Sequence, residues 1–555
     1  MAKARGLHAH FYERSFLVTR QSKRLKPFAA IAAALCLGLS SPPGSARAAV
    51  GPPAPSRTVA VDFARVKGPT SQVYRQCIGA GRANEGLRAD WQRQLAYTQQ
   101  KCGFQYIRMH GIFADDMGVY SEDKSGRPVY NWQYVDQLYD FLLSIHVRPF
   151  VELGFMPGAL ASGQQTIFWW RGNVTPPKDY DKWHDLVAAA TRHWTERYGQ
   201  DEVKNWYFEV WNEPNLKGGF WTGDQQDYFK LYAASATAIK SVSPQYRVGG
   251  PATAGNGWIT DFIRYCTDHH TPVDFVSTHT YGVGQGFLDA DGSRGTVVSR
   301  NPNAVSGDMW GARAEIAASP LPRLPLFYTE WSASYTPSDP IHDNYVEAAY
   351  ILDKVKNGEL AVSSMSYWTF TDIFEEAGPR ATPFHGGFGL INYEDILKPA
   401  FFAYRFLNEL GPTELVNRDP SSFVTRDGRG GVQALLWDFT ITQPGIENDQ
   451  VFYKKDHPAR SKGEVALRVA HLPTGRYTVR CTLVGYRSND PYATYMDLGS
   501  PSQLTRPQVA LIKRKNGGVL YLTRTIAVTP ELPFQMRLPL RENDVYLVTL
   551  TKAAR

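Results

Sequence analysis

The chain has 555 residues, of which 43% are hydrophobic, 13% aromatic and 20% charged. Its 47 glycines and 36 prolines together make up about 15% of the chain, well below the roughly 25–30% typical of low-complexity disorder. The sequence therefore predicts a globular protein, and its length allows more than one hydrophobic core. The formal net charge of +7 comes from residues 1–48, which hold eight basic residues and one acidic residue. The remainder is formally neutral, which gives no support for nucleic-acid binding.

The N-terminus is predicted to be an export signal, residues 1–48. Four basic residues between Arg20 and Lys26 precede a twelve-residue apolar run, Phe28–Leu39, which is shorter than the about 20 residues needed to span a bilayer. Small residues follow and end in Ala46-Arg47-Ala48, an A-x-A cleavage pattern. We expect cleavage after Ala48, export to the periplasm or the outside of the cell, and no stable membrane association afterwards; an uncleaved anchor is the alternative.

A (β/α)₈ barrel is predicted for residues 70–411, after a linker and a possible strand at residues 49–69. Eight strand-like runs alternate with amphipathic helices, which is the pattern of this barrel. The runs are Gln76–Ala80, Phe104–Met109, Val147–Leu153, Trp206–Trp211, Arg247–Gly250, Asp274–Thr278, Leu326–Thr329 and Ser364–Thr369. A doubly wound sheet is the alternative, but Gly79-Ala-Gly81-Arg-Ala does not complete its G-x-G-x-x-G turn.

The composition changes after Gly411. Short β-rich runs separated by turn residues predict a β-sandwich over residues 412–555, interrupted by a small helical insertion at about residues 490–515. Thr58–Val66 is also β-like and is a candidate strand of the same sheets, although it precedes the barrel. The predicted fold class is therefore α/β, a TIM barrel followed by a C-terminal β-sandwich.

Two glutamates stand at the ends of the fourth and seventh predicted strands. Glu213 lies in Asn212-Glu-Pro214, and Glu330 lies in Thr329-Glu-Trp331. Active sites of this barrel are built at the C-terminal ends of its strands. Two carboxyl groups that converge on a sugar are the catalytic groups of a glycosidase, where one protonates the leaving oxygen and the other attacks the anomeric carbon. The fold must therefore push their pKa values apart.

The motifs around these glutamates resemble glycoside hydrolase family 39, which contains β-xylosidases and α-L-iduronidases. The likeness runs in order over roughly residues 70–410. Its motifs are Arg108-Met-His-Gly111, Asp115-Asp-Met117, Glu152-Leu-Gly-Phe-Met-Pro157, Trp211-Asn-Glu-Pro-Asn-Leu216, Val248-Gly-Gly-Pro251, Ser277-Thr-His-Thr-Tyr281, Thr329-Glu-Trp331 and Asp372-Ile-Phe-Glu-Glu376. The resemblance implies that Glu213 is the general acid/base and Glu330 the nucleophile.

Three further residues are expected near the nucleophile. Alternation along a strand places Arg108 and His110 on one face. Arg108 is expected to hold Glu330 ionised through a charge-assisted hydrogen bond, and an ion pair with Glu209 is the alternative. Tyr281 is expected to hydrogen-bond Glu330, and His110 is a candidate contact to the sugar.

Four more residues are candidate contacts to the sugar. Asn212 is expected to bind the 2-hydroxyl, and His279 another hydroxyl, with a buried structural histidine as the alternative. Trp368 is expected to form an apolar floor under the ring, against plain core packing. Glu376 is expected to accept a hydrogen bond from a hydroxyl, against an exposed loop position.

No cofactor and no metal are predicted. The candidate carboxylates and histidines lie on different strands without metal-ligand spacing. The four cysteines beyond residue 48 match no metal pattern and are too few for a disulfide scaffold. We expect them to be buried free thiols.

The resemblance implies a retaining exo-glycosidase that removes terminal β-D-xylose from xylo-oligosaccharides; the oligomeric state of the protein is left open. A hydrolase for L-iduronide, L-arabinoside or a secreted polysaccharide is one alternative. A uronide site needs a cation, and Arg171, Lys178 and Arg380 are candidates in loops. A carbohydrate-binding protein without catalysis is the second alternative, and the presence of both carboxylates disfavours it.

Overall fold

The computed structural model describes residues 55–286 and 295–553. The predicted signal peptide, residues 1–48, lies outside them. Among the helices of the described ranges, none is both long enough and apolar enough to cross a lipid bilayer.

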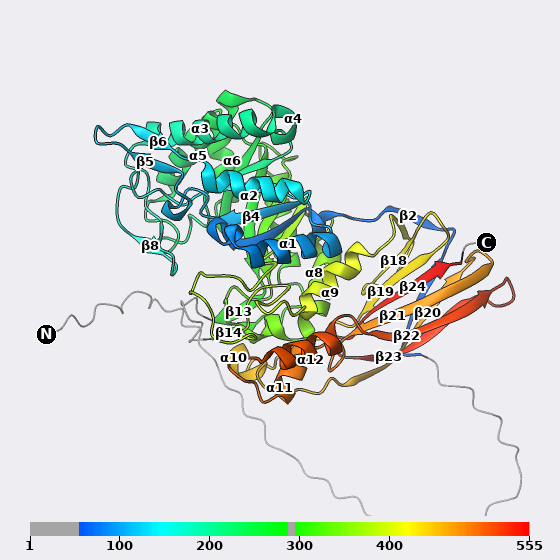
Figure 1. The fold of residues 1–555 in the computed structure, drawn as a ribbon. Helices are drawn as coiled ribbons and strands as arrows, with labels where there is room; N and C mark the ends of the chain where they lie inside the picture. Colours follow the sequence, from blue (N-terminus) through cyan, green and yellow to red (C-terminus); the bar gives the residue numbers. More distant parts are fainter. Residues whose placement is uncertain (1–54, 287–294, 554–555) are drawn as a thin grey trace, which may run out of the picture. The chain divides into compact units, whose positions relative to one another are not determined.

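Eight parallel strands close into a barrel, as predicted (Figure 1). They are β3 (Cys77–Arg82), β4 (Tyr106–His110), β7 (Arg148–Leu153), β10 (Tyr207–Val210), β11 (Arg247–Ala254), β12 (Phe275–Tyr281), β15 (Leu326–Ser332) and β16 (Ser364–Tyr367). The strands are buried on both faces, which is why they read as nearly continuous apolar runs in the sequence. Every one of the eight predicted runs overlaps a barrel strand, so the barrel prediction is confirmed.

A helix follows each barrel strand and packs on the outside of the barrel. These helices are α1 (Ala89–Cys102), α2 (Gln133–Ser144), α3 (Tyr180–Tyr198), α5 (Gln225–Val242), α6 (Ile259–Asp268), α7 (Ser306–Ala317), α8 (Val346–Gly358) and α9 (Pro399–Asn408), with the single turn α4 (Gln200–Val203) after α3. In α5, Asp224 and Asp227 form a reciprocal capping box, which satisfies backbone donors of the first turn. The side chains of Tyr228, Leu231 and Tyr232 form its buried face.

An aromatic layer fills the N-terminal end of the barrel. Its members lie at or near the starts of the strands and are five aromatic side chains with Cys77 beside them: Tyr106, Phe150, Tyr207, Phe275 and Phe327. The ring centroids of Tyr207 and Phe327 lie 5.0 Å apart in an edge-to-face arrangement, which is favourable for aromatic pairs. This end is therefore apolar and closed, and the polar side chains of the strands gather at the opposite, C-terminal end.

Short hairpins are inserted into the loops at that polar end, and the sequence did not predict them. They are β5 (Tyr120–Glu122) with β6 (Pro128–Tyr130), β8 (Thr166–Ile167) with β9 (Gly172–Asn173), and β13 (Val283–Gly286) with β14 (Thr296–Val298). Asp449 and Gln450 of α10 (Asp449–Phe452) accept hydrogen bonds from the backbone N–H groups of Val298 and Thr296 at 2.8 and 2.9 Å. A segment late in the chain therefore supports a loop beside the barrel mouth.

Two further sheets are built mostly from the part of the chain after the barrel. The first is ordered β1 (Arg57–Asp62), β20 (Ser461–Ala470) and β23 (Phe534–Arg541). The second is ordered β2 (Val66–Pro69), β17 (Thr413–Leu415), β18 (Ser422–Arg426), β19 (Val432–Trp437), β24 (Val545–Lys552), β21 (Gly475–Val484) and β22 (Leu520–Val528). Val59 and Leu467 of the first sheet share one apolar core with Val479 and Val548 of the second.

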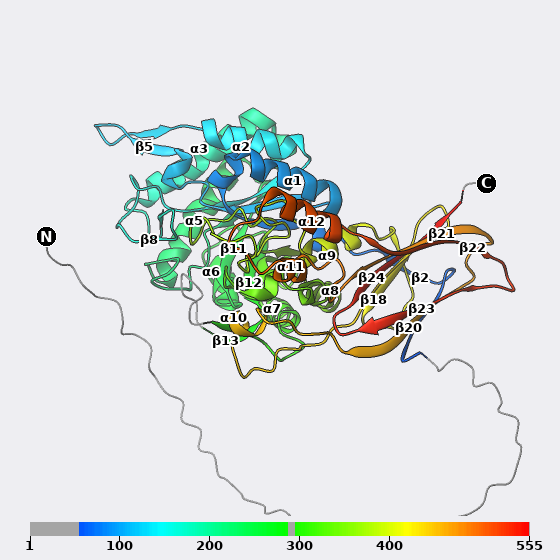
Figure 2. The same cartoon turned by 60° about the horizontal axis from the view of Figure 1, so that its bottom comes forward.

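The segment before the barrel lies within these sheets, where β2 appears beside the later strands in Figures 1 and 2. β1 pairs with β20 in parallel and β2 with β17 in antiparallel orientation. Helices α11 (Pro491–Asp497) and α12 (Arg506–Asn516) occupy the region where the sequence predicted a helical insertion. The cysteines of the described residues are all buried and free.

Candidate active site

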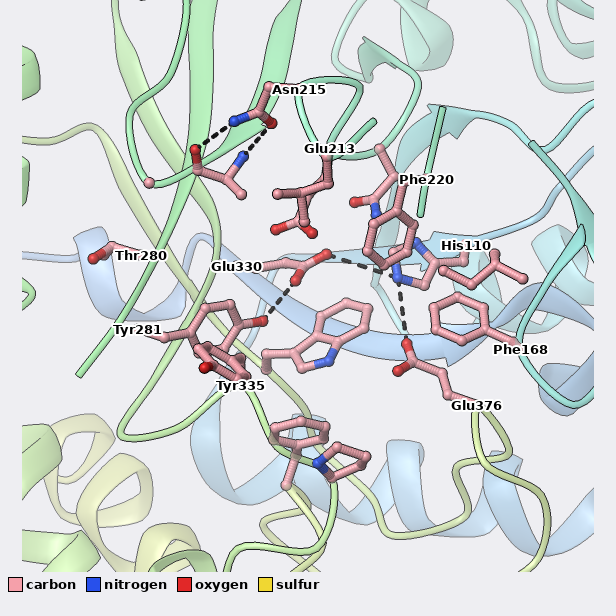
Figure 3. Close-up of a pocket in the computed structure, with 18 of the residues that line it drawn as sticks. His110, Phe168, Glu213, Asn215, Phe220, Thr280, Tyr281, Glu330, Tyr335 and Glu376 are labelled. Carbon is pink, nitrogen blue, oxygen red and sulfur yellow. Dashed lines mark hydrogen bonds and ion pairs between the residues drawn. The ribbon is translucent and has the colours of Figure 1, made fainter. Parts of the chain in front are cut away.

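Glu213 and Glu330 face each other in a cavity at the C-terminal end of the barrel (Figure 3). Glu213 follows β10 and Glu330 lies within β15. Trp211 and Glu213 have positive φ angles of 69° and 43°, a region that non-glycine residues adopt at a cost and usually at functional sites. One carboxylate oxygen of each glutamate and one ring nitrogen of His279 lie within 4.8 Å of one another.

Both carboxylate oxygens of Glu330 receive a strong hydrogen bond. Arg108 Nη1 donates to Oε1 at 2.6 Å, and the hydroxyl of Tyr281 donates to Oε2 at 2.6 Å. Donors on both oxygens stabilise a negative charge on this carboxylate and hold it in place.

Arg108 connects several acidic groups beneath the cavity. It is fully buried, and its Nε donates to Glu209 at 2.5 Å while its Nη2 contacts Asn212 Oδ1 at 2.8 Å and Glu152 Oε2 at 2.9 Å. Burial alone would lower the pKa of Arg108, but the surrounding carboxylates raise it. The contact with Glu330 and the alternative ion pair with Glu209 are therefore both present.

The environment of Glu213 is different from that of Glu330. Its side chain is 9% exposed, and burial raises its pKa to about 7, against a smaller opposing effect of Arg108. Its Oε1 lies 2.8 Å from His279 Nδ1. A carboxyl group with such a pKa holds a proton near neutral pH, as a general acid must.

The sequence predicts that His279 contacts a sugar hydroxyl, with a buried structural histidine as the alternative, and its position in the structure fits the alternative better. The side chain is fully buried and is not among the residues that line the cavity. Nδ1 faces Glu213 and Nε2 lies 3.2 Å from Thr329 Oγ1, so both ring nitrogens have protein partners. His279 is thus within hydrogen-bond distance of Glu213, and its contact to the sugar stays a prediction.

His110 and Glu376 form one wall of the cavity (Figure 3). His110 Nδ1 lies 2.7 Å from Glu152 Oε2, and its Nε2 lies 3.6 Å from Glu376 Oε1. Burial lowers the pKa of His110 to about 3, so the ring is neutral. Burial and the nearby Glu330 raise the pKa of Glu376 well above its usual range. Glu376 lines the cavity, as its predicted role requires.

Trp368 also lines the cavity, at the end of β16, and Asn212 lines it from the end of β10. The Trp368 ring lies 4.8 Å from the His110 ring, measured between centroids. Gly79 of β3 makes room for Trp368, because a Cβ at Gly79 would lie 2.5 Å from the indole ring. The Asn212 amide is held by Arg108 through its oxygen.

The cavity measures about 970 Å³, and part of its wall is formed by aromatic loop residues that the sequence analysis missed. Phe168 comes from the segment between β8 and β9, and Phe220 from the loop after β10; Tyr335 and Phe388 lie on loops after β15 and β16. Isolated aromatic residues in loops carry no pattern that separates them from core residues, so only the folded structure reveals them.

Glu213, His279 and Glu330 are close enough together to share a metal ion. The chemistry of the set argues against one. Arg108 and Tyr281 already donate to both oxygens of Glu330, and the guanidinium charge would repel a cation. The residues fit a pair of catalytic carboxyl groups better than a metal site.

Comparison with known proteins places this arrangement in a family. The family model described as "Glycosyl hydrolases family 39" matches residues 57–528. The chain belongs to this family. It is therefore a glycoside hydrolase.

Known β-xylosidases resemble this chain in sequence and in fold. A β-xylosidase of Geobacillus stearothermophilus is 45% identical over 374 residues, which is 66% of this chain and 74% of that protein. One of Caldicellulosiruptor saccharolyticus is 42% identical over 353 residues, 63% of this chain and 71% of that protein. The crystal structure of a monomeric β-xylosidase from Caulobacter crescentus CB15 superposes with a TM-score of 0.86 at 44% identity, covering 90% of this chain and all of that one.

Proposed function

We propose that this glycosidase removes terminal β-D-xylose from xylo-oligosaccharides with retention of the anomeric configuration. The observation that carries the proposal is the pair of carboxyl groups with oxygens within 4.8 Å of each other. Retaining enzymes place these groups about 5–5.5 Å apart, too close to admit an attacking water between them. The named β-xylosidases at 42–45% identity support the choice of sugar.

In the first step, an oxygen of Glu330 attacks the anomeric carbon of the bound sugar. The bond from that carbon to the leaving oxygen breaks, and Glu213 gives its proton to this oxygen. The covalent glycosyl-enzyme then remains on Glu330. In the second step, Glu213 takes a proton from water, the resulting hydroxide attacks the same carbon, and the ester bond to Glu330 breaks. Two displacements on opposite faces give net retention.

The lining of the cavity favours a neutral sugar over a uronide. Within the described residues, no lysine or arginine lines it, whereas Glu213, Glu330, Glu376 and Asp308 do. A uronide carboxylate would meet acidic groups without a cation to pair with. The candidates Arg171, Lys178 and Arg380 are not among the described lining residues.

Substrate and stereochemistry are tested together. We expect hydrolysis of an aryl β-D-xyloside, with β-xylose as the first-formed sugar in the proton NMR spectrum. An aryl α-L-iduronide should react at least about a hundredfold more slowly, since its carboxylate is buried without a partner. With xylotetraose, exo action releases xylose and xylotriose first.

Three results would contradict these proposals separately. Initial α-xylose contradicts retention, early xylobiose from xylotetraose contradicts exo action, and faster turnover of the iduronide contradicts the choice of sugar.

The pH dependence of kcat/KM is expected to report the protonation state of Glu213. We expect kcat/KM for an aryl xyloside with a poor leaving group to fall above pH about 7, because Glu213 loses the proton that the leaving oxygen needs. A dinitrophenyl xyloside needs no such proton and should keep its kcat/KM to higher pH. Initial rates of both substrates across pH 5–9 check this, and an identical fall for both would exclude Glu213 as its origin.

A further inference from the structure

Thr329 reaches the barrel interior through an irregularity in β15. Against β12, Tyr328 pairs with Thr278 but Glu330 pairs with His279, and the register with β16 also shifts between Tyr328 and Trp331. Thr329 is therefore an extra residue, as in a β-bulge. In a regular strand, Thr329 and Glu330 would point to opposite faces. Here both point inward, and Thr329 is only 1% exposed.

The Thr329 hydroxyl has two partners but only one hydrogen. Oγ1 lies 2.8 Å from Glu209 Oε1 and 3.2 Å from His279 Nε2. The other oxygen of Glu209 is paired with Arg108, so Glu209 is a carboxylate and can only accept. The Thr329 hydroxyl therefore donates its hydrogen to Glu209, and its oxygen must accept a hydrogen bond from His279 Nε2. The hydrogen of the His279 ring is then on Nε2.

This assignment determines what His279 presents to Glu213. Burial lowers the pKa of His279 to about 4, so the ring is neutral and carries one hydrogen. With that hydrogen on Nε2, Nδ1 has a lone pair directed at Glu213 Oε1, 2.8 Å away. If Glu213 were ionised, a lone pair of its oxygen would face the lone pair of Nδ1, and the two would repel. If Glu213 is protonated, its O–H group donates a hydrogen bond to Nδ1.

We propose that Thr329 is a positioning residue that fixes His279 as its Nε2–H tautomer, so that Nδ1 of His279 accepts a hydrogen bond from the protonated carboxyl group of Glu213 and keeps Glu213 in its acid form. The inference rests on the proposed role of Glu213 as acid/base. After Glu213 has protonated the leaving group, its anion faces the lone pair of Nδ1. That repulsion makes the anion a stronger base toward the incoming water, whose proton then restores the original hydrogen bond.

Other charged and titratable groups surround the pair. Glu330 Oε2 lies 3.6 Å from His279 Nδ1. The remaining groups are Arg108 and His110 from β4, Glu152 from β7, Glu209 from β10, Tyr281 from β12, and Glu376 from the loop after β16. The Thr329 hydroxyl contacts only Glu209 and His279 among these groups, and Thr329→Ser keeps both contacts, so the comparison of the two variants reports the hydroxyl.

Thr329→Val and Thr329→Ser test the proposal as a matched pair. Valine keeps the shape of threonine and removes the hydroxyl, whereas serine keeps the hydroxyl. In Thr329→Val, the His279 hydrogen is free to move to Nδ1 and to stabilise ionised Glu213. We expect the basic limb of the pH profile of kcat/KM to move to a pH about one unit lower, which corresponds to a tenfold change in the acid dissociation constant of Glu213. In Thr329→Ser the limb should stay near its original pH.

The tautomer is measured directly, without turnover, by the ¹⁵N shifts of labelled histidine, with His279→Asn to assign the signal. We expect Nε2–H in the original protein and in Thr329→Ser, and a gain of Nδ1–H in Thr329→Val. An Nδ1–H signal in the original protein overturns the proposal even if Thr329→Val fails to fold. Equal pH limbs in two folded variants also overturn it. Absence of xylosidase activity would refute the proposed function alone, because the tautomer is still measurable.

Discussion

Replacing Glu330 with glutamine is expected to lower kcat/KM for an aryl xyloside on the order of 10⁴-fold or more. The amide has nearly the shape of the carboxylate but cannot form the glycosyl-enzyme. Sugar binding should survive, because the residues that line the cavity remain in place. Initial rates together with xylose binding by calorimetry measure the two effects separately.

Glu376→Gln is a matched control for Glu330→Gln, since Glu376 lines the same cavity without a covalent role. We expect it to cost less than about a hundredfold, the scale of a lost hydrogen bond to substrate. A 2-deoxy-2-fluoroxyloside with a good leaving group should label the original protein on Glu330, as seen by peptide mass spectrometry. Label on another residue, or less than about a hundredfold loss in Glu330→Gln, would remove Glu330 from the nucleophile role.

Replacing Glu213 with alanine is expected to affect substrates according to their leaving groups. A dinitrophenolate departs without protonation, so its first step should survive. The second step should not, because no base remains to activate water. A burst of phenolate, slow steady turnover and a low apparent KM are the expected signature. Xylobiose should lose its first step, by about 10²–10⁴-fold, and show no burst.

Azide distinguishes the acid/base role from a structural effect of the same substitution. As a small anion it needs no deprotonation, so it should attack the accumulated glycosyl-enzyme, restore turnover of the dinitrophenyl substrate and yield a β-xylosyl azide. His279→Asn, which removes the partner of Glu213 while keeping the carboxyl group, should show no such rescue. If Glu213→Ala slows both substrates equally and azide has no effect, the acid/base lies elsewhere.

The barrel could be predicted from the sequence because the patterns that specify its strands and helices lie within short segments of the chain. Strands buried on both faces must be apolar along their whole length, and the amphipathic helices between them leave little choice of topology. The positions of Glu213 and Glu330 followed from the same logic, since the C-terminal ends of the strands meet at one edge whatever the loops do. The surrounding motifs then indicated the family, and the structure places Arg108 and Tyr281 in hydrogen bonds with Glu330, as the sequence analysis expected.

Only the tertiary structure decided the finer chemistry of the site. The hydrogen-bond partner of His279 depends on ring orientation, which alternation along a strand does not specify, and in the structure Nδ1 faces Glu213. Thr329 reaches the interior through a register shift that leaves the apolar pattern of β15 unchanged. The aromatic wall comes from Phe168 and Phe220 on loops distant in sequence. Hydrogen bonds and cavity walls depend on side-chain positions to within a fraction of an ångström, and these arise only when separate parts of the chain pack together.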